Sequence, residues 1–164
     1  MSTSYLEPTE WYASLPSVFT SACLLLTDTK DRVLLVKPNY REGWGFPGGI
    51  TEAGEAPHDC AMREAAEELG LSVRAGELLV VHWLPPSGKR PRAMINFMFD
   101  GGTLSDPGSI KLQVEELDDA SFLSWDTAAT LLPANIVARL PAARRARENR
   151  SPVYLPGEPG VIGG

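Results

Sequence analysis

Glu64, Glu67 and Glu68 are spaced at i, i+3 and i+4 in a stretch whose composition predicts a helix. At about 100° per residue, side chains with this spacing share one helix face. Three carboxylates on one face repel each other and raise one another's pKa values. A divalent cation removes that repulsion, and carboxylate oxygens with room for water suit Mg²⁺ or Mn²⁺. The alternative is a solvated helix face whose glutamates pair with Arg63.

The residues around the glutamates predict how they are held. Arg63 lies one turn before Glu67 and can also reach back toward Glu55, which would tie the preceding loop to the acidic face. Pro57 suits a first helical position and Gly70 suits a helix end. The apolar positions expected to bury against a sheet are Met62, Ala65, Ala66 and Leu69.

The stretch from Gly49 to Leu71 resembles the Nudix box of the Nudix hydrolase family. The positions of fixed identity in that pattern are all present: Gly49, Glu55, Arg63, Glu64, Glu67, Glu68 and Gly70. Leu71 fits one of the two bulky aliphatic positions, whereas Ala65 departs from the other. The resemblance implies a metal-dependent hydrolase that cleaves a phosphoanhydride bond in a nucleoside diphosphate linked to another group.

The resemblance also implies roles for individual residues. Glu64 and Glu68 are expected to bind the metal, and Glu67 to share the metal cluster or orient its water. The carbonyl of Gly49 is a further candidate ligand, because glycine lets the backbone approach closely. Arg63 is expected to support these catalytic residues through its ion pair with Glu55. Chelation of the metal is expected to abolish activity.

Candidate substrate-binding residues lie outside this stretch. Tyr40 and Arg41 stand in a turn-rich loop before it, where either can contact substrate. A basic cluster between two expected strands can bind phosphates, although a solvated hairpin tip explains it equally well: Lys89, Arg90 and Arg92. Glu116, with its neighbour Glu115, is a candidate general base or part of a solvated acidic turn.

Other polar residues are interpreted as structural. His58 and His82 have no metal-binding neighbours at a useful spacing. The basic segment near the C-terminus is expected to be a solvated helix face rather than a nucleic-acid contact. Its arginines are Arg139, Arg144, Arg145, Arg147 and Arg150.

The elements that position these residues follow from apolar runs and turn signals. Strands are expected at 18–27, 32–37, 71–75, 77–84, 93–99 and 121–125, with an edge strand at 153–155. Residues 100–108 are expected to form a loop. Besides the helix from Pro57, helices are expected at 126–132, capped by Asp126, and at 134–147, interrupted by Pro141.

This order of elements indicates an α+β or α/β fold. The resemblance narrows the expectation to the Nudix α/β/α sandwich with a mixed sheet, as a single domain over residues 1–164. Its core is expected at about 18–140. Residues 1–16 are expected to be an arm lying loosely over the domain, and 151–164 an irregular tail.

The chain has 164 residues and a formal net charge of -6, which argues against general polyanion binding. Cys23 and Cys60 provide no disulfide framework, and no signal peptide or bilayer-spanning run is apparent. We therefore expect a cytoplasmic protein that binds a nucleotide-type small molecule, with no membrane contact and no strong nucleic-acid signal. Two alternatives are a non-catalytic nucleotide-sensing module and a decapping relative, the latter disfavoured by the acidic balance. A homodimer is compatible with the resemblance.

Overall fold

The computed structural model describes residues 6–157, in which seven strands form one mixed sheet. In chain order the strands are β1 Phe19–Asp28, β2 Val33–Pro38, β3 Gly48–Ile50, β4 Leu78–Leu84, β5 Met94–Leu104, β6 Leu117–Leu123 and β7 Val153–Leu155. Their spatial order is β6-β2-β1-β5-β4-β7, and β3 pairs with β1. β1 runs parallel to β5 and antiparallel to β2 and β3, so the sheet is mixed as predicted.

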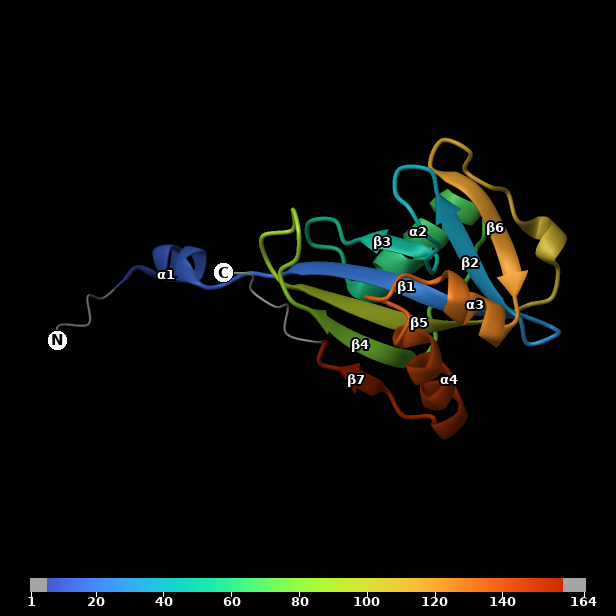
Figure 1. Cartoon of the computed structure of the whole chain (residues 1–164). Helices are drawn as coiled ribbons and strands as arrows, with labels where there is room; N and C mark the ends of the chain where they lie inside the picture. Colours follow the sequence, from blue (N-terminus) through green and yellow to red (C-terminus); the bar gives the residue numbers. More distant parts are fainter. Residues whose placement is uncertain (1–5, 158–164) are drawn as a thin grey trace.

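Helices cover both faces of this sheet (Figure 1). The covering helices are α2 Pro57–Leu69, α3 Trp125–Leu131 and α4 Arg139–Asn149. The described residues also form α1 Pro8–Ser14, which does not cover the sheet, and a short 3₁₀ turn at Pro107–Ser109. α2 packs on one face, and α3 and α4 pack on the other. The predicted α/β/α sandwich is confirmed.

The alternation of β1 explains why both faces need a cover. Ala22, Leu24 and Leu26 are buried in the cluster with α2, whereas Cys23 and Leu25 are buried in the cluster with α3 and α4. A strand that is apolar on both sides is stable only between two layers, since each exposed face would otherwise leave apolar area in water.

α2 begins and ends where the sequence predicts. Pro57 occupies its first turn, and Gly70 closes it in the left-handed conformation at φ 64°. The buried stripe differs from the prediction, because Ala66 is exposed and Met62 only half-buried. Glu68 instead joins Ala65 on the side that faces the sheet, although it is a carboxylate.

Several expected boundaries are wrong. Residues 71–75 form no strand, and 100–104 are not a loop because β5 stays paired with β1 as far as Leu104. Ser124 caps α3 in place of Asp126, since its Oγ accepts the Thr127 N–H at 3.1 Å. α4 begins at Arg139, and Pro141 lies in its first turn, where a missing N–H breaks no helical hydrogen bond. The edge strand at 153–155 is confirmed as β7, parallel to β4.

The N-terminal arm contains a helix that its composition did not predict. α1 has no buried residue and projects away from the sheet instead of lying over it (Figure 1). Residues 1–5 of the expected arm and the part of the expected tail beyond residue 157 lie outside the described residues.

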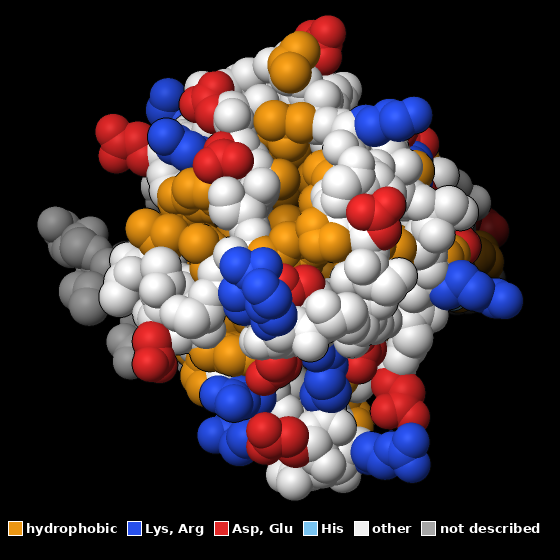
Figure 2. All heavy atoms as spheres, turned by 90° about the vertical axis from the view of Figure 1, so that its right-hand side faces the viewer, with side chains coloured by type: hydrophobic (Ala, Val, Ile, Leu, Met, Phe, Trp, Pro, Cys, Tyr) orange, Lys and Arg blue, Asp and Glu red, His pale blue; other side chains and the backbone are white. Residues whose placement is uncertain are grey.

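The surface shows no continuous basic patch on the face drawn in Figure 2, where acidic and basic side chains are interspersed with apolar ones. That face therefore offers no stripe of positive charge for a nucleic-acid backbone. Between residues 6 and 157, none of the helices has the length and apolar character that crossing a bilayer requires.

Candidate functional site

The site is built where the loop ending in β3 crosses the C-terminal half of α2. The Gly48 N–H donates to Oε2 of Glu68 at 3.1 Å, and the Glu68 side chain is only 4% exposed. A Cβ on Gly48 would lie 2.6 Å from Cα of Cys23 in β1, so only glycine allows this backbone to approach the strand. The close approach is what seats Glu68 beneath the loop.

Gly49 brings Glu64 to the same place. A Cβ on Gly49 would lie 2.5 Å from Cδ of Glu64, so the missing side chain makes room for the carboxylate. The Gly49 carbonyl accepts a weak hydrogen bond from Sγ of Cys60 at 3.5 Å. Glu64, Glu68 and the Gly49 carbonyl are therefore neighbours around one short piece of backbone.

Arg63 ties the loop to α2, as predicted. Its Nε and Nη2 donate to the two oxygens of Glu55 at 2.8 and 3.0 Å. Nη1 donates to Glu64 at 3.0 Å and Glu67 at 3.1 Å, and Nη2 donates to the Ile50 carbonyl at 3.1 Å. The guanidinium holds the pKa of Glu55 down at about 2. Arg63 thus fixes both the loop and the Glu64 side chain.

Burial and like charge act on the two inner carboxylates. Burial is the main cause that raises the pKa of Glu68 to about 8, with Glu64 and Glu116 adding repulsion and the Gly48 N–H opposing the shift. Burial also raises the pKa of Glu64, against the attraction of Arg63. Glu116, on the turn before β6, repels both. Arg63 therefore compensates Glu64 directly, whereas no arginine or lysine forms an ion pair with Glu68 within residues 6–157.

Side chains supply only part of the ligand set that a Mg²⁺-like cation needs. Within the described ranges, no three His, Cys, Asp or Glu side chains converge as a ready-made metal group. Glu67 is 52% exposed and directed to Arg63, which leaves Glu64, Glu68 and the Gly49 carbonyl. Mg²⁺ is commonly held by one or two carboxylates, with waters and substrate phosphates completing its shell. The buried Glu68 and the half-buried Glu64 fit that mode of binding.

The raised pKa of Glu68 predicts how the metal-free protein responds to pH. The Glu68 carboxyl ionises near pH 4.5 in the unfolded chain and near pH 8 in the folded protein. Its contribution to the free energy of unfolding is therefore fully present below pH 4.5 and is lost as the pH rises through 8. The loss is on the order of 5 kcal/mol. Urea unfolding in EDTA at several pH values measures it. Glu68→Gln should flatten this dependence, and an unchanged slope in the variant would contradict the assignment.

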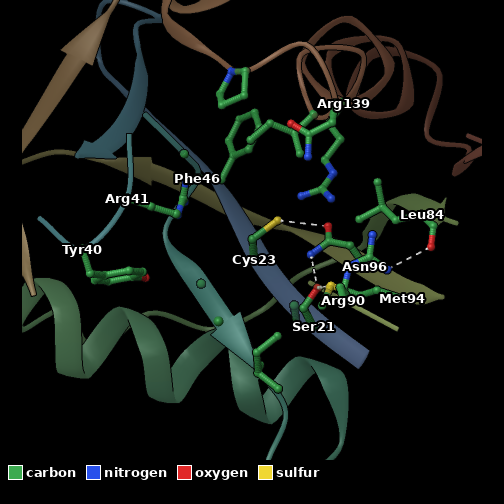
Figure 3. A pocket seen from close by; sticks show the side chains of 18 residues that line it. Ser21, Cys23, Tyr40, Arg41, Phe46, Leu84, Arg90, Met94, Asn96 and Arg139 are labelled. Atoms are coloured by element: carbon green, nitrogen blue, oxygen red, sulfur yellow. Dashed lines mark hydrogen bonds between the residues drawn. The ribbon is translucent and has the colours of Figure 1, made fainter. Parts of the chain in front are cut away.

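A cavity of about 360 Å³ opens beside β3 (Figure 3). Gly48 and Gly49 line it next to the carboxylates, Tyr40 and Arg41 line it from the preceding loop, and Arg139 enters from α4. Arg41 is close enough to lower the pKa of Glu68. The cavity can therefore take a small molecule that reaches from the acidic cluster to α4.

The structure does not bring the three predicted basic residues together. Arg90 lines the cavity, but its guanidinium donates to the carbonyls of Leu84, Pro85 and Arg92. Arg92 stacks on the Phe19 ring at 4.1 Å from its centroid, and Lys89 is exposed at the hairpin tip. Of this cluster, only Arg90 borders the space beside the acidic residues.

The floor of the cavity contains residues that sequence reasoning missed. Asn96 donates to Ser21 at 2.8 Å and accepts from the Cys23 thiol at 3.4 Å. Arg139 is buried and donates through Nε to Nδ1 of His82 at 2.9 Å, so the expectation of a solvated arginine is wrong here. The only sequence signal for these floor residues was the alternation of side chains along β1 and β5, which places polar side chains on the sheet face that lines the cavity.

Comparisons with known proteins agree with this geometry. A family model described as NUDIX domain matches residues 18–145. The uncharacterized Nudix hydrolase YvcI of Bacillus subtilis is 30% identical over 113 residues, which cover 59% of this chain and 65% of that protein. An RNA pyrophosphohydrolase of Psychrobacter cryohalolentis is 40% identical over 63 residues, which cover 37% of this chain and 36% of that protein. This chain thus spans less than two thirds of either relative.

A solved structure shares the fold over most of both chains. The MutT protein from Methanosarcina mazei Go1 superposes with a TM-score of 0.68 at 25% identity. The match covers 84% of this chain and all of that one. The mixed sheet with helices on both faces is therefore a known arrangement.

Proposed function

Because the chain belongs to the Nudix hydrolase family, we propose that it is a pyrophosphohydrolase that uses a divalent cation, Mg²⁺ or Mn²⁺, to cleave a phosphoanhydride bond in a nucleoside diphosphate derivative. The observation that carries this proposal is the meeting of two carboxylates, the buried Glu68 and the half-buried Glu64, at the glycine loop whose Gly48 and Gly49 line a cavity. Buried carboxylates that repel each other are costly unless a cation joins them. Here the cavity gives a substrate access to that cation.

We assign the residues the following roles. Glu64, Glu68 and the Gly49 carbonyl would hold the cation, which when bound would neutralise charge on the phosphates and acidify a water molecule. Arg63 positions Glu64 through its bond at 3.0 Å and fixes the loop through Glu55. Because Glu67 shares Nη1 of Arg63 with Glu64, it acts in the outer part of the same cluster.

Three further residues receive roles in the reaction or in substrate binding. Glu116 repels both Glu64 and Glu68 from the turn before β6, and we assign it as the candidate general base for an attacking water. Arg41 provides positive charge on the cavity side of Glu68, where it would bind phosphate oxygens of the substrate. Tyr40, 67% exposed on the same loop, would contact the outer part of the substrate.

Hydrolysis of a substrate panel tests this function. The panel holds ADP-ribose, nucleoside triphosphates and dinucleoside polyphosphates, each with Mg²⁺ and with excess EDTA. We expect turnover of at least one compound with Mg²⁺, loss of turnover in EDTA and recovery when Mg²⁺ is restored. Full turnover in EDTA would refute the metal-dependent mechanism. Absence of turnover across the panel, with nucleotide still bound, would instead indicate the nucleotide-sensing module.

A further inference from the structure

Arg139 is a buried charge without an acidic partner. It is 7% exposed at the start of α4, its Nε donates to Nδ1 of His82 at 2.9 Å, and its other side-chain partner is the thiol of Cys23. Over residues 6–157, no aspartate or glutamate forms an ion pair with it, in contrast to Arg147, which pairs with Asp100 at 2.7 Å. A guanidinium stays ionised in proteins, so its charge is left without compensation.

The groups around Arg139 are neutral or positive. Burial raises the pKa of the Cys23 thiol, which therefore stays protonated. Burial and Arg139 lower the pKa of His82 to about 4, so its ring is neutral and accepts the Nε–H. Asn96 is a neutral amide, and Arg41 is near enough to lower the pKa of Arg139. In the described part of the chain, the side chains that bond to the guanidinium are therefore neutral.

The side chain is also directed into the cavity. Figure 3 shows the Arg139 guanidinium extending from α4 into the space above Cys23 and Asn96. With Nε held by His82, the planar group has a fixed orientation, and within residues 6–157 no carboxylate forms an ion pair with its Nη atoms. A guanidinium held in this way suits an acceptor with two oxygens, such as a phosphoryl or carboxylate group.

Arg41 and Arg139 line different parts of the cavity. Figure 3 shows Arg41 on the loop side of the cavity, toward β3, and Arg139 entering from α4 on the other side of Cys23. The diphosphate that meets the cation belongs beside Arg41. An anion at Arg139 must then be a different group of the same substrate.

We propose that Arg139 binds a second acidic group of the substrate, a phosphoryl or carboxylate group other than the diphosphate that is cleaved. This inference rests on the proposed function and adds a substrate class to it: nucleoside diphosphate derivatives that carry an additional anion. A neutral nucleobase edge would leave the guanidinium charge uncompensated and is therefore the poorer ligand.

Anion binding without turnover tests the site first. The ¹⁵N-labelled chain, free of metal in EDTA, is titrated with inorganic phosphate and separately with acetate, and the Nε–H of Arg139 and the ring of His82 are followed by NMR. We expect a saturable shift with at least one anion, and the stronger binder identifies the phosphoryl or the carboxylate class. No saturable shift at these atoms in the wild type would overturn the proposal, whether or not the protein hydrolyses anything.

Variants then assign the binding to Arg139. Arg139→Gln should raise the dissociation constant of the anion at least tenfold, and Arg139→Lys, which keeps the charge, provides a second variant if the first does not fold. Arg145→Gln is the matched control, because Arg145 is exposed on the same helix. The proposal would be overturned if the wild type, Arg139→Lys and Arg139→Gln all bound the anion with equal affinity.

Paired substrates connect the site to catalysis. UDP-glucuronate and UDP-glucose differ by one carboxylate, and NADPH and NADH differ by one phosphate. For the pair that matches the NMR result, we expect the wild type to prefer the charged member in kcat/KM, and Arg139→Gln to reduce that preference at least tenfold through KM. An unchanged preference in the variant would overturn the inference. Loss of turnover with every compound, with the NMR shift retained, would count against the proposed function and not against the anion site.

Discussion

Replacing Glu68 with glutamine is expected to lower kcat on the order of 10³-fold, because a metal centre contributes several kcal/mol to the transition state. The substitution keeps the size of the side chain and its hydrogen bond from the Gly48 N–H, which is 3.1 Å long. It removes the charge that a cation would meet at a side chain only 4% exposed. Steady-state hydrolysis at saturating Mg²⁺ measures the effect.

Folding must be separated from catalysis in this variant. A neutral amide relieves the repulsion from Glu64 and Glu116, so we expect the metal-free variant to be at least as stable as the wild type near neutral pH. Asp59→Asn is the matched control, because Asp59 is an exposed carboxylate on the same helix. Wild-type kcat in a folded Glu68→Gln protein would remove Glu68 from the catalytic centre.

Replacing Arg63 with glutamine has the second large effect. The change removes the donors to Glu55, Glu64, Glu67 and the Ile50 carbonyl. The loss of these hydrogen bonds lowers the free energy of unfolding, and loosening a group that orients a metal ligand costs about 10–100-fold in activity. Urea unfolding and kcat/KM measure the two losses separately.

A double-mutant cycle identifies the source of the loss. Arg63→Gln and Glu55→Gln should be strongly non-additive in stability, because the two side chains share two hydrogen bonds of 2.8 and 3.0 Å. Arg63→Lys should not restore activity, since an ammonium cannot reproduce the bidentate geometry. Arg145→Gln is the control for charge. Additive losses would show that Arg63 does not act through Glu55.

Much of the acidic centre could be predicted from residue types and spacing. Pro57 and Gly70 mark the ends of α2 because their backbone preferences are local, and the i, i+4 spacing of Glu64 and Glu68 puts both toward one side. The reach of Arg63 back to Glu55 followed from the same helical geometry. Local periodicity therefore sufficed for the ion pair and the helix.

Features that depend on distant contacts could not be predicted in this way. Glu68 is buried because β3 is held against β1 through Gly48, and a three-residue strand leaves no periodic signal. β5 continues through Gly102, a residue typical of turns, because its neighbour β1 is long enough to pair with it. Composition also could not separate Arg139 from the exposed arginines of α4, since only the packing of α4 on β4 directs it inward.

Binding of Mn²⁺, followed by electron paramagnetic resonance, tests the central claim that the box carboxylates hold the catalytic cation. The titration compares wild type, Glu64→Gln, Glu68→Gln and the control Asp59→Asn. We predict that each box variant raises the dissociation constant at least tenfold, while Asp59→Asn matches the wild type. Wild-type Mn²⁺ affinity in both box variants would place the cation elsewhere and contradict the account.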